Sequence, residues 1–370
     1  MVSRIYAVAL SMVPGLGCRG YRTLLDVYPD PQEVFSLSES GLKELFGRHT
    51  NIIDTIRSRS LIERAENEVR LAESKKIRIL FCGDDDYPQR LNNSSCSDCP
   101  PILYVVGKCN LNGYRALGVV GTRRATMHGR ETAHRIVCDL GQEQVTIVSG
   151  LAYGIDTVAH TAALECGLPT VAVLGHGLDR IYPAANRGLA QRIVENGGCI
   201  VTEYTYGTEI NAAYFPARNR IIAALSDGTM VVEAAEKGGA LITATIAGSY
   251  NREVMAVPGR PTDNYSVGCN NLLIEHRASL VCTARDVMRT MGWYDEKKTI
   301  GGTQQELFVA VTDAEQKIID MLVEKDVMTL DELATQTEST LSRMAATMLE
   351  MELRGLVKVL PGSRYQAFRR

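Results

Sequence analysis

The sequence predicts an α/β protein built on an extended, Rossmann-like, doubly wound parallel sheet, with a small helical domain before the sheet and a winged helix after it. Three observations support this class. Short runs rich in Val, Ile and Leu alternate with helical patterns through the middle of the chain. Helical spacing precedes them, and three helical patterns with a hairpin pattern follow them. We place the domains at residues 1–70, 71–294 and 304–370, which agrees with the two or three domains expected for 370 residues.

The first domain, residues 1–70, is interpreted as a set of short helices of the SAM or helix-hairpin-helix type. Its turn Val13–Gly17 contains one proline and two glycines, and Tyr21 and Leu24 follow it at helical spacing. In helix-hairpin-helix modules, the free backbone N–H groups of such a turn hold a phosphate. A tight turn between two packed helices has the same pattern, so both interpretations stay open.

The central region contains eight β-rich runs that predict the strands of one sheet. Because helical stretches separate these apolar runs, we expect parallel pairing with helices on both faces. Ligands of such sheets bind beyond the carboxyl ends of the strands. The loops beginning at Gly121, Gly150, Gly175, Tyr204 and Ala234 are therefore expected to meet in one crevice. The predicted strands are Ile77–Cys82, Leu117–Gly121, Val145–Ser149, Thr170–Leu174, Cys199–Thr202, Met230–Glu233, Glu253–Val257 and Ser279–Cys282.

The last domain, after a polar linker at Asp295–Thr303, has the pattern of a winged helix-turn-helix. From residue 313 onward it contains ten acidic and eight basic residues, so we do not expect it to bind duplex DNA strongly. A protein contact, or a weak DNA contact through the basic tail, fits this charge better than transcriptional regulation. The predicted elements are helices at Asp313–Lys325, Leu330–Thr337 and Leu341–Leu353 and a hairpin formed by Val357–Leu360, the turn Pro361–Ser363, and Tyr365–Phe368.

Composition and charge exclude several classes of protein. The net charge of −3 gives no overall basic surface, so any phosphate site must be local. Between residues 116 and 260 nearly all basic residues are arginines, whose planar guanidinium suits bidentate phosphate recognition. The longest apolar runs are too short to span a membrane. Ten scattered cysteines favour reduced thiols in the cytoplasm over a disulfide framework, and the single Cys96–Cys99 motif, without a second pair, predicts no metal site.

The loops after the first two core strands combine glycines with polar residues. Gly121 is followed by Thr122, Arg123 and Arg124, so the G-x-G-x-x-G dinucleotide fingerprint is absent, which disfavours NAD and FAD. A Gly-Thr-Arg loop before a helix still predicts an anion pocket. In the next loop, Ser149–Asp156, two glycines indicate close backbone approach, and Asp156 is interpreted as a helix N-cap rather than as an acid–base partner of His160.

Three later loops add aromatic, cationic and glycine-rich positions. Tyr182 precedes Asn186–Arg187, and the pair Tyr214-Phe215 precedes Arg218–Arg220. Exposed bases of single-stranded nucleic acid stack on aromatic rings while the phosphates follow a cationic groove, so these pairs predict such a ligand. The loop Glu233–Thr243 is a candidate phosphate cradle, although Glu233 could instead be the base of a nucleotide hydrolase.

The order of these motifs resembles the DNA-processing protein A (DprA/Smf) family over residues 77–290. The resemblance implies a non-enzymatic protein without a cofactor, which binds single-stranded DNA, forms a homodimer and loads the RecA recombinase during natural transformation. Gly238, where the family usually has Ser, and Ala184, where some relatives have Lys, depart from the pattern. The motifs are Gly121–Arg123, Ser149–Asp156 with Ala159–His160, Tyr182-Pro183, Phe215–Ile222, Gly239–Thr243 and Val257–Gly259.

The alternative function is a Rossmann-type hydrolase of nucleoside monophosphates, but the loop at 237–243 lacks the Gly-Gly-x-Gly-Thr pattern that it requires.

From the loops and the resemblance together we predict two sets of site residues. The predicted dimer interface contains Asn271, Leu272, Ile274 and Leu280. The predicted nucleic-acid contacts are Gly121, Thr122, Arg123, Arg124, Gly150, Tyr182, Asn186, Arg187, Arg218, Asn219, Arg220, Gly239 and Thr243.

Overall fold

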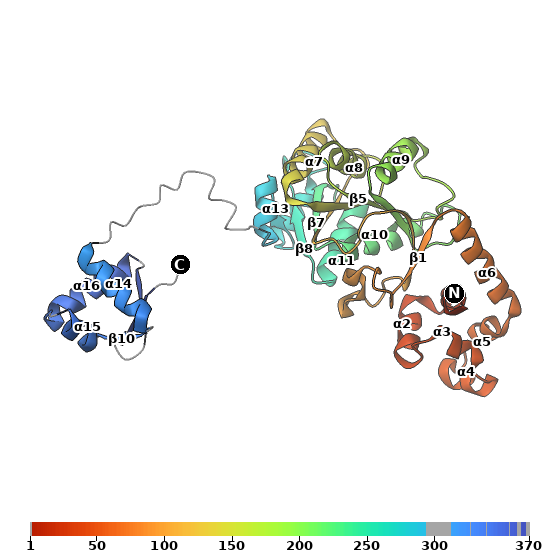
Figure 1. Cartoon of the computed structure of the whole chain (residues 1–370). Helices are drawn as coiled ribbons and strands as arrows, with labels where there is room; N and C mark the ends of the chain where they lie inside the picture. The colour runs from red at the N-terminus through yellow and green to blue at the C-terminus, as the bar shows by residue number, and fades with distance from the viewer. Residues whose placement is uncertain are drawn as a thin grey trace. The chain divides into compact units, whose positions relative to one another are not determined.

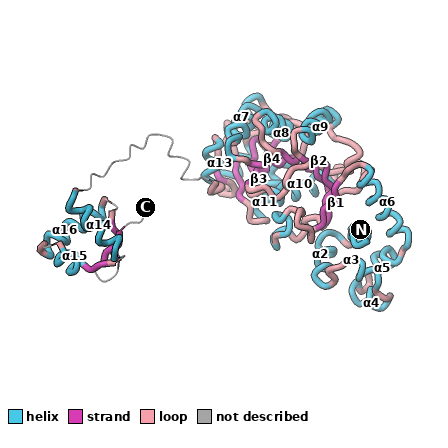
Figure 2. The backbone as a smooth tube through the Cα atoms, viewed as in Figure 1, coloured by secondary structure: helices cyan, strands magenta, loops and turns pink. Residues whose placement is uncertain are grey.

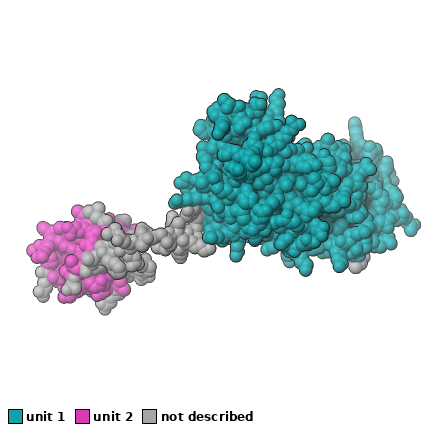
Figure 3. Space-filling view, turned by 90° about the horizontal axis from the view of Figure 1, so that it is seen from above, with its two compact units in different colours: residues 1–294 teal, residues 295–370 magenta. Residues whose placement is uncertain are grey.

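The computed structural model describes residues 2–293, 312–325, 327–337, 339–354, 356–360 and 364–367. It divides into two compact units, residues 1–294 and 295–370, which Figure 3 colours teal and magenta. The predicted boundary at residue 70 falls inside a helix of the first unit, so that boundary stays a prediction. The predicted linker Asp295–Thr303 and the turn Pro361–Ser363 lie outside the described residues.

The chain begins with helices that share one apolar core. The long helix α6 packs along α1, and the buried side chains include Val8, Leu10, Leu42 and Leu61. The turn before α2 uses Gly15 and Gly17 at φ of +86° and +63°, a region that favours glycine. The helices are α1 (Val2–Ser11), α2 (Gly17–Val27), α3 (Pro31–Ser36), α4 (Glu39–Phe46), α5 (Thr50–Arg57) and α6 (Arg59–Ser74).

A nine-stranded sheet in the order β1-β2-β6-β5-β4-β3-β7-β8-β9 forms the centre of the first unit (Figures 1 and 2). From β6 to β9 all neighbouring strands are parallel, and all eight predicted runs contribute a strand, which confirms the fold class. The strands are β1 (Arg78–Phe81), β2 (Ile102–Gly107), β3 (Arg115–Gly121), β4 (Val145–Ser149), β5 (Thr170–Val173), β6 (Cys199–Thr202), β7 (Gly228–Glu233), β8 (Glu253–Ala256) and β9 (Ser279–Leu280).

One edge of the sheet differs from the prediction. The strand β2 was not predicted, and it pairs antiparallel with both β1 and β6. The connection from β1 to β2 contains two short 3₁₀ turns, η1 (Gln89–Asn92) and η2 (Ser94–Cys96), but no α-helix. Without a crossover helix the chain returns in the opposite direction, so the expectation of uniformly parallel pairing was wrong at this edge.

Helices cover both faces of the sheet. Figure 1 shows α7, α8 and α9 on one side and α10 and α11 on the other. The strands supply both layers because their side chains alternate: Leu117 and Val119 join the cluster under α7 and α8, whereas Ala116 and Val120 join the cluster under α10 and α11. The helices are α7 (Met127–Asp139), α8 (Ile155–Glu165), α9 (Arg187–Glu195), α10 (Tyr214–Leu225), α11 (Gly239–Ser249), α12 (Val267–Ile274) and α13 (Ala284–Thr290), with 3₁₀ turns η3 (Gly141–Glu143) and η4 (Ala184–Asn186).

The cysteines also differ in part from the prediction. Cys138 on α7 and Cys166 after α8 form a disulfide, so the expectation that all thiols are reduced was wrong for this pair. Cys96 and Cys99 are both buried free thiols. Within the described residues no group of three His, Cys, Asp or Glu side chains is placed to hold a metal ion. In the same residues, no helix has the length and hydropathy needed to cross a membrane.

The second unit is a winged helix, as predicted. Three helices enclose a core that includes Leu322, Leu333 and Met348, and a three-stranded antiparallel sheet in the order β10-β12-β11 packs against it. Its elements are α14 (Asp313–Lys325), β10 (Met328–Thr329), α15 (Leu330–Gln336), α16 (Leu341–Leu353), β11 (Val357–Leu360) and β12 (Arg364–Ala367). The short strand β10 was not predicted.

Candidate nucleic-acid interface

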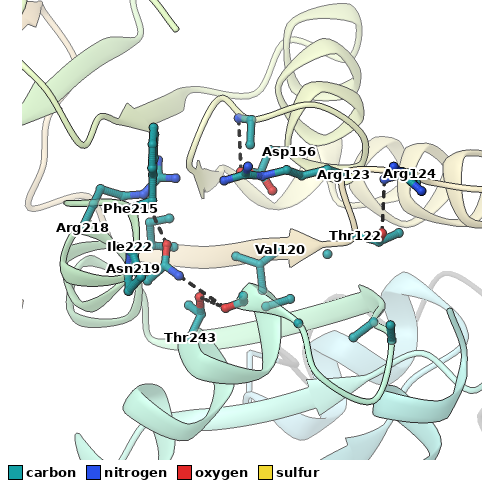
Figure 4. Close-up of a pocket in the computed structure, with 18 of the residues that line it drawn as sticks. Val120, Thr122, Arg123, Arg124, Asp156, Phe215, Arg218, Asn219, Ile222 and Thr243 are labelled. Atoms are coloured by element: carbon teal, nitrogen blue, oxygen red, sulfur yellow. Dashed lines mark hydrogen bonds between the residues drawn. The ribbon is translucent and has the colours of Figure 1, made fainter. Parts of the chain in front are cut away.

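A crevice of about 680 Å³ opens where β3 and β7 end (Figure 4). Loops from several strands meet there, as expected for the carboxyl edge of a doubly wound sheet. The loop that begins at Tyr204 joins them only at its far end: Ala212 lines the crevice, whereas Tyr204, Thr205 and Thr208 line a different cavity. The predicted residues that line the crevice are Gly121, Thr122, Arg123, Arg124, Tyr182, Arg218, Asn219, Gly239 and Thr243.

Two glycines bring the loops after β3 and β4 into contact. A Cβ atom on Gly121 would lie 2.5 Å from the side chain of Ile155. Gly154 has a φ of +77°, and a Cβ atom there would lie 2.2 Å from the carbonyl oxygen of Thr122. Larger residues at these positions would separate the two loops. The sequence predicted close backbone approach in the loop after β4, and contact with the loop after β3 explains it.

The outer part of the crevice, which we call the rim, consists of Arg123, Arg124, Lys237, Tyr182 and Phe215. The three cations are exposed. The guanidinium carbon of Arg123 lies 5.5 Å from the Phe215 ring centre, and the rings of Tyr182 and Phe215 are 5.7 Å apart. Figure 4 shows Arg123 extending toward α10 while Arg124 points away from it. The rim thus offers aromatic faces beside exposed positive charge.

The inner part, which we call the floor, is built on the buried side chains of Arg218 and Asp156. Arg218 Nη1 donates to the carbonyl oxygens of Gly150, at 2.6 Å, and Val173. The Asp156 carboxylate accepts from the backbone N–H groups of Gly150 and Ala152 at 3.2 and 3.3 Å. Asp156 therefore stabilises the loop before α8 instead of capping the helix, because its carboxylate accepts hydrogen bonds from N–H groups that precede the helix.

Burial dominates the electrostatics of the floor. It lowers the pKa of Arg218 to about 10, so the guanidinium stays charged at neutral pH. It raises the pKa of Asp156, although Arg218 and the two backbone donors favour the carboxylate form. Arg218 lines the crevice as predicted, but its charge holds carbonyl groups of the protein.

Gly150 and Asn186 do not line the crevice, contrary to the prediction. A Cβ atom on Gly150 would lie 2.3 Å from the Arg218 guanidinium, so glycine here leaves room for that side chain. Asn186 is buried, and its Nδ2 donates to the Leu151 carbonyl and to Thr157 Oγ1 at 2.8 and 2.9 Å. Both residues support the loop after β4 rather than a ligand.

Two predicted arginines also lie elsewhere. Arg187 is exposed at the start of α9 and is not among the residues that line the crevice. Arg220 forms an ion pair with Glu203 in which each side chain is only 13% exposed. Residues two apart on a helix point in nearly opposite directions, so Arg218 and Arg220 of α10 cannot serve the same crevice. The predicted phosphate contact by Arg220 is therefore wrong.

The predicted anion site at the start of α7 is occupied by a carboxylate of the protein itself. Thr126 caps the helix by accepting from Gly129 N–H, and Glu233 accepts from both the backbone N–H and the hydroxyl of Thr126. Glu233 is only 8% exposed. Because this carboxylate is held by structural donors, the geometry does not support Glu233 as the base of a hydrolase.

His160, the other candidate for acid–base chemistry, is enclosed in the core. Its Nδ1 lies 2.7 Å from Thr170 Oγ1 on the neighbouring strand β5. Burial lowers the pKa of His160 to about 3, so the ring is neutral at physiological pH. The residue therefore packs α8 against the sheet, and Asp156 and His160 form no catalytic pair.

The glycine-rich loop before α11 supplies the opposite wall. Gly238 precedes the helix without a side-chain cap, and both Gly238 and Gly239 line the crevice. Asn219 Nδ2 and Thr243 Oγ1 each donate to the Gly239 carbonyl at 3.3 Å. The uncapped first turn leaves backbone N–H groups available to an anion, as the sequence predicted for this loop.

Lys237 and Tyr265 are among the lining residues that were absent from the predicted set. Tyr265 follows β8, and the rule that placed the other loops at this edge applied equally to the loop after the predicted strand Glu253–Val257. Of the described residues that line the crevice, four are cationic and only Asp156 carries a carboxylate. This local excess contrasts with the net charge of −3 of the whole chain.

The predicted dimer residues separate into exposed and buried positions. Ile274 and Leu280 are 74% and 56% exposed, and Asn271 is half-buried. Leu272 is only 4% exposed and belongs to the core under α11 and α12, so it is not available to a partner. The three other residues stay predictions.

The chain matches two family models. Residues 78–292 match the model of DNA recombination-mediator protein A, and residues 307–363 match that of the DprA winged helix domain. Protein Smf of Escherichia coli is 35% identical over 80% of this chain and 79% of its own length. DNA processing protein DprA of Streptococcus pneumoniae is 42% identical over 58% of this chain and 75% of its own length.

Two solved structures are similar as well. The X-ray structure of DNA processing protein A from Streptococcus pneumoniae superposes with a TM-score of 0.63 at 33% identity, over 78% of this chain and 97% of that one. The protein of the same name from Helicobacter pylori, described for its single-stranded DNA binding mode, gives a TM-score of 0.53 at 28% identity, over 59% and 96%. With the fold, the crevice and both family models in agreement, the chain belongs to the DNA recombination-mediator protein A (DprA/Smf) family.

Proposed function

We propose that the crevice binds single-stranded DNA and that the chain acts as a recombination mediator without catalysing a reaction of its own. The rim carries the proposal, because it combines three exposed cations with the rings of Tyr182 and Phe215. Such a surface can stack unpaired bases while its cations neutralise phosphates, whereas duplex DNA hides its base faces. The single-stranded DNA binding mode described for the Helicobacter pylori relative supports the same ligand.

The finer parts of the proposal come from the family. The chain would act as a homodimer and load RecA onto a strand that enters the cytoplasm during natural transformation. Ile274 and Leu280 support a dimer because both are large apolar side chains that stay exposed in the described structure. Replacing both with Glu is expected to yield a monomer in analytical ultracentrifugation, and an unchanged dimer would exclude this surface.

The binding test is an oligonucleotide titration at several salt concentrations. Each phosphate contact adds about 0.7 to the slope of log K against log salt for a single strand. Arg123→Ala is expected to lower the slope by about one contact, whereas Arg192→Ala, an exposed arginine of α9 outside the crevice, is expected to leave it unchanged. Equal slopes for both variants would contradict the site.

Two further assays separate the proposal from its alternatives. Recombinase pull-down with the full chain and with a chain lacking residues 303–370 tests RecA binding and shows whether the winged helix takes part. Incubation with nucleoside monophosphates tests the hydrolase alternative, since released base would contradict a purely DNA-binding role. The buried position of Glu233 predicts that no base is released.

A further inference from the structure

A second cavity, of about 310 Å³, lies between the N-terminal helices and the sheet. We call it the inter-region cavity. Residues from the α1–α2 turn, the start of β2 and the loop after β6 line it, together with Tyr214. The adjacent residue Phe215 lines the crevice instead. Neighbouring residues of α10 thus serve two separate hollows.

Two tyrosines that stack on each other line this cavity. The rings of Tyr204 and Tyr214 are stacked, with their centres 4.4 Å apart and an angle of 27° between their planes. Both residues line the cavity and both are half-buried. A stacked pair that borders a hollow offers a face on which a third planar ring can stack.

The buried polar group of the cavity is Glu203, the partner of Arg220 in the ion pair described above. Glu203 lines the cavity, and Arg220 contacts both Glu203 and the lining residue Cys18, whose Sγ is 3.8 Å from Nη2. In the described part of the chain, Glu203 Oε1 and Arg220 Nη1 are buried without a hydrogen-bond partner. Buried polar atoms are normally paired, so an unsatisfied acceptor on a residue that lines the cavity indicates a ligand that donates a hydrogen bond.

We propose that the inter-region cavity binds a nucleobase, stacked on the Tyr204–Tyr214 pair, with an N–H donor toward Glu203. A base presents an N–H donor on the edge of a flat ring, which matches both the stacked tyrosines and the unpaired acceptor of Glu203. This inference goes beyond the proposed function, because it concerns a separate site and does not depend on DNA binding in the crevice.

The size and charge of the cavity limit the ligand further. A volume of about 310 Å³ equals about ten water molecules, which suits one base with its sugar and excludes an oligonucleotide. The carboxylate of Glu203 disfavours a phosphate at the inner end. The exposed Arg64 also lines the cavity, so the phosphate of a mononucleotide would lie near that side chain.

The test is a calorimetric titration of the full chain with adenosine. Tyr214→Ala is expected to weaken adenosine binding at least tenfold and to leave unchanged the binding of a short oligonucleotide confined to the crevice, whereas Phe215→Ala is expected to do the reverse. Tyr214→Phe, which keeps the stacking face, should restore adenosine binding. If Tyr214→Ala and wild type bind adenosine equally, or if wild type binds none, the inference is wrong whatever the crevice does.

A second ligand tests the hydrogen bonds apart from the stacking. N6,N6-dimethyladenosine keeps the ring but has no donor on the exocyclic nitrogen, so it would leave Glu203 Oε1 unpaired. We expect it to bind at least tenfold more weakly than adenosine. Equal affinity would contradict the assigned donor and acceptor, and this outcome does not depend on the folding of any variant.

The base could come from a free nucleotide or from the end of a bound strand. Titrating adenosine into the protein saturated with an oligonucleotide distinguishes these sources. Undiminished adenosine affinity assigns the cavity to a free nucleotide. If the oligonucleotide abolishes adenosine binding, and Tyr214→Ala also weakens the binding of a strand long enough to reach the cavity, the cavity binds the strand end. Displacement of adenosine without any effect of Tyr214→Ala on the strand would place adenosine in the crevice and overturn the inference.

Discussion

The rim and the floor of the crevice use the same residue type for different purposes. Arg123 at the rim is exposed and contacts the face of Phe215, whereas Arg218 at the floor is 4% exposed and donates to two backbone carbonyls. An arginine that donates to backbone carbonyls stabilises the loops that surround it, and an exposed arginine can bind a phosphate. Burial therefore decides which arginines are structural and which can bind DNA.

The largest effect is expected from removing the floor arginine. Arg218→Ala leaves the buried Asp156 carboxylate without its cationic neighbour and removes the donor from the carbonyls of Gly150 and Val173. Breaking such a buried arrangement costs about 3–5 kcal/mol of unfolding free energy. Chemical denaturation followed by circular dichroism measures the loss.

The matched control for this variant is Arg124→Ala at the exposed rim. A surface substitution away from special features changes stability by less than about 0.5 kcal/mol. If the two variants lose similar stability, the division of the crevice into a structural floor and a binding rim does not hold.

The next largest effect concerns acid stability and the histidine beneath the floor. The pKa of His160 is about 3 in the folded chain, and an unfolded histidine has a pKa of about 6.5. The unfolded state therefore takes up the proton first, and stability that is complete above pH 6.5 is lost as the pH falls toward 3. The loss from this group is about 1.4 kcal/mol per pH unit, or roughly 3 kcal/mol at pH 4.

His160→Gln keeps a hydrogen-bonding side chain but cannot be protonated in this range. Urea denaturation between pH 7 and pH 4 is expected to show a flatter pH dependence for this variant than for the wild type. His134, which is exposed and lies 2.8 Å from Glu165, provides the control, since His134→Gln should retain the wild-type profile. Identical profiles for all three chains would show that His160 does not govern the acid response.

The parallel strands whose carboxyl ends border the crevice, and most of the rim, could be predicted because they depend on local sequence. Runs of Val, Ile and Leu mark the parallel strands, and glycines after β3 and β4 mark loops that touch. The strand β2 was missed because a long polar segment and two prolines precede it and no helix separates it from β1. A strand that enters a sheet without a crossover unit lacks the alternating pattern on which the prediction relied.

Two errors in the site residues have a common cause. Arg218 and Arg220 were assigned to one groove, and Leu272 and Ile274 to one interface, although each pair is separated by two positions on a helix. Side chains at that spacing point in nearly opposite directions, so one of each pair had to face elsewhere. Which residue of a pair faces the site depends on its partners elsewhere in the fold, such as Glu203 for Arg220, and that could not be predicted from local spacing.

A smaller effect, on affinity alone, is expected from the aromatic part of the rim. Phe215→Leu keeps an apolar side chain but removes the ring on which a base can stack, which costs about 1–3 kcal/mol per base, or about 5- to 150-fold in affinity for a single strand. Fluorescence anisotropy with a labelled oligonucleotide measures this. Tyr153→Leu removes an exposed ring outside the crevice and should bind like wild type, so a loss shared by both variants would contradict the assigned stacking site.

The smallest effect on DNA affinity is expected from replacing Arg187. This variant tests whether the binding surface extends beyond the rim. This residue is exposed like Arg123 but is not among the residues that line the crevice, so Arg187→Ala is expected to change affinity less than twofold and to keep the wild-type salt slope. A short oligonucleotide confined to the crevice gives the sharpest comparison. If Arg187→Ala lowers the slope as much as Arg123→Ala does, exposure alone decides which arginines bind the strand, and the crevice has no special role.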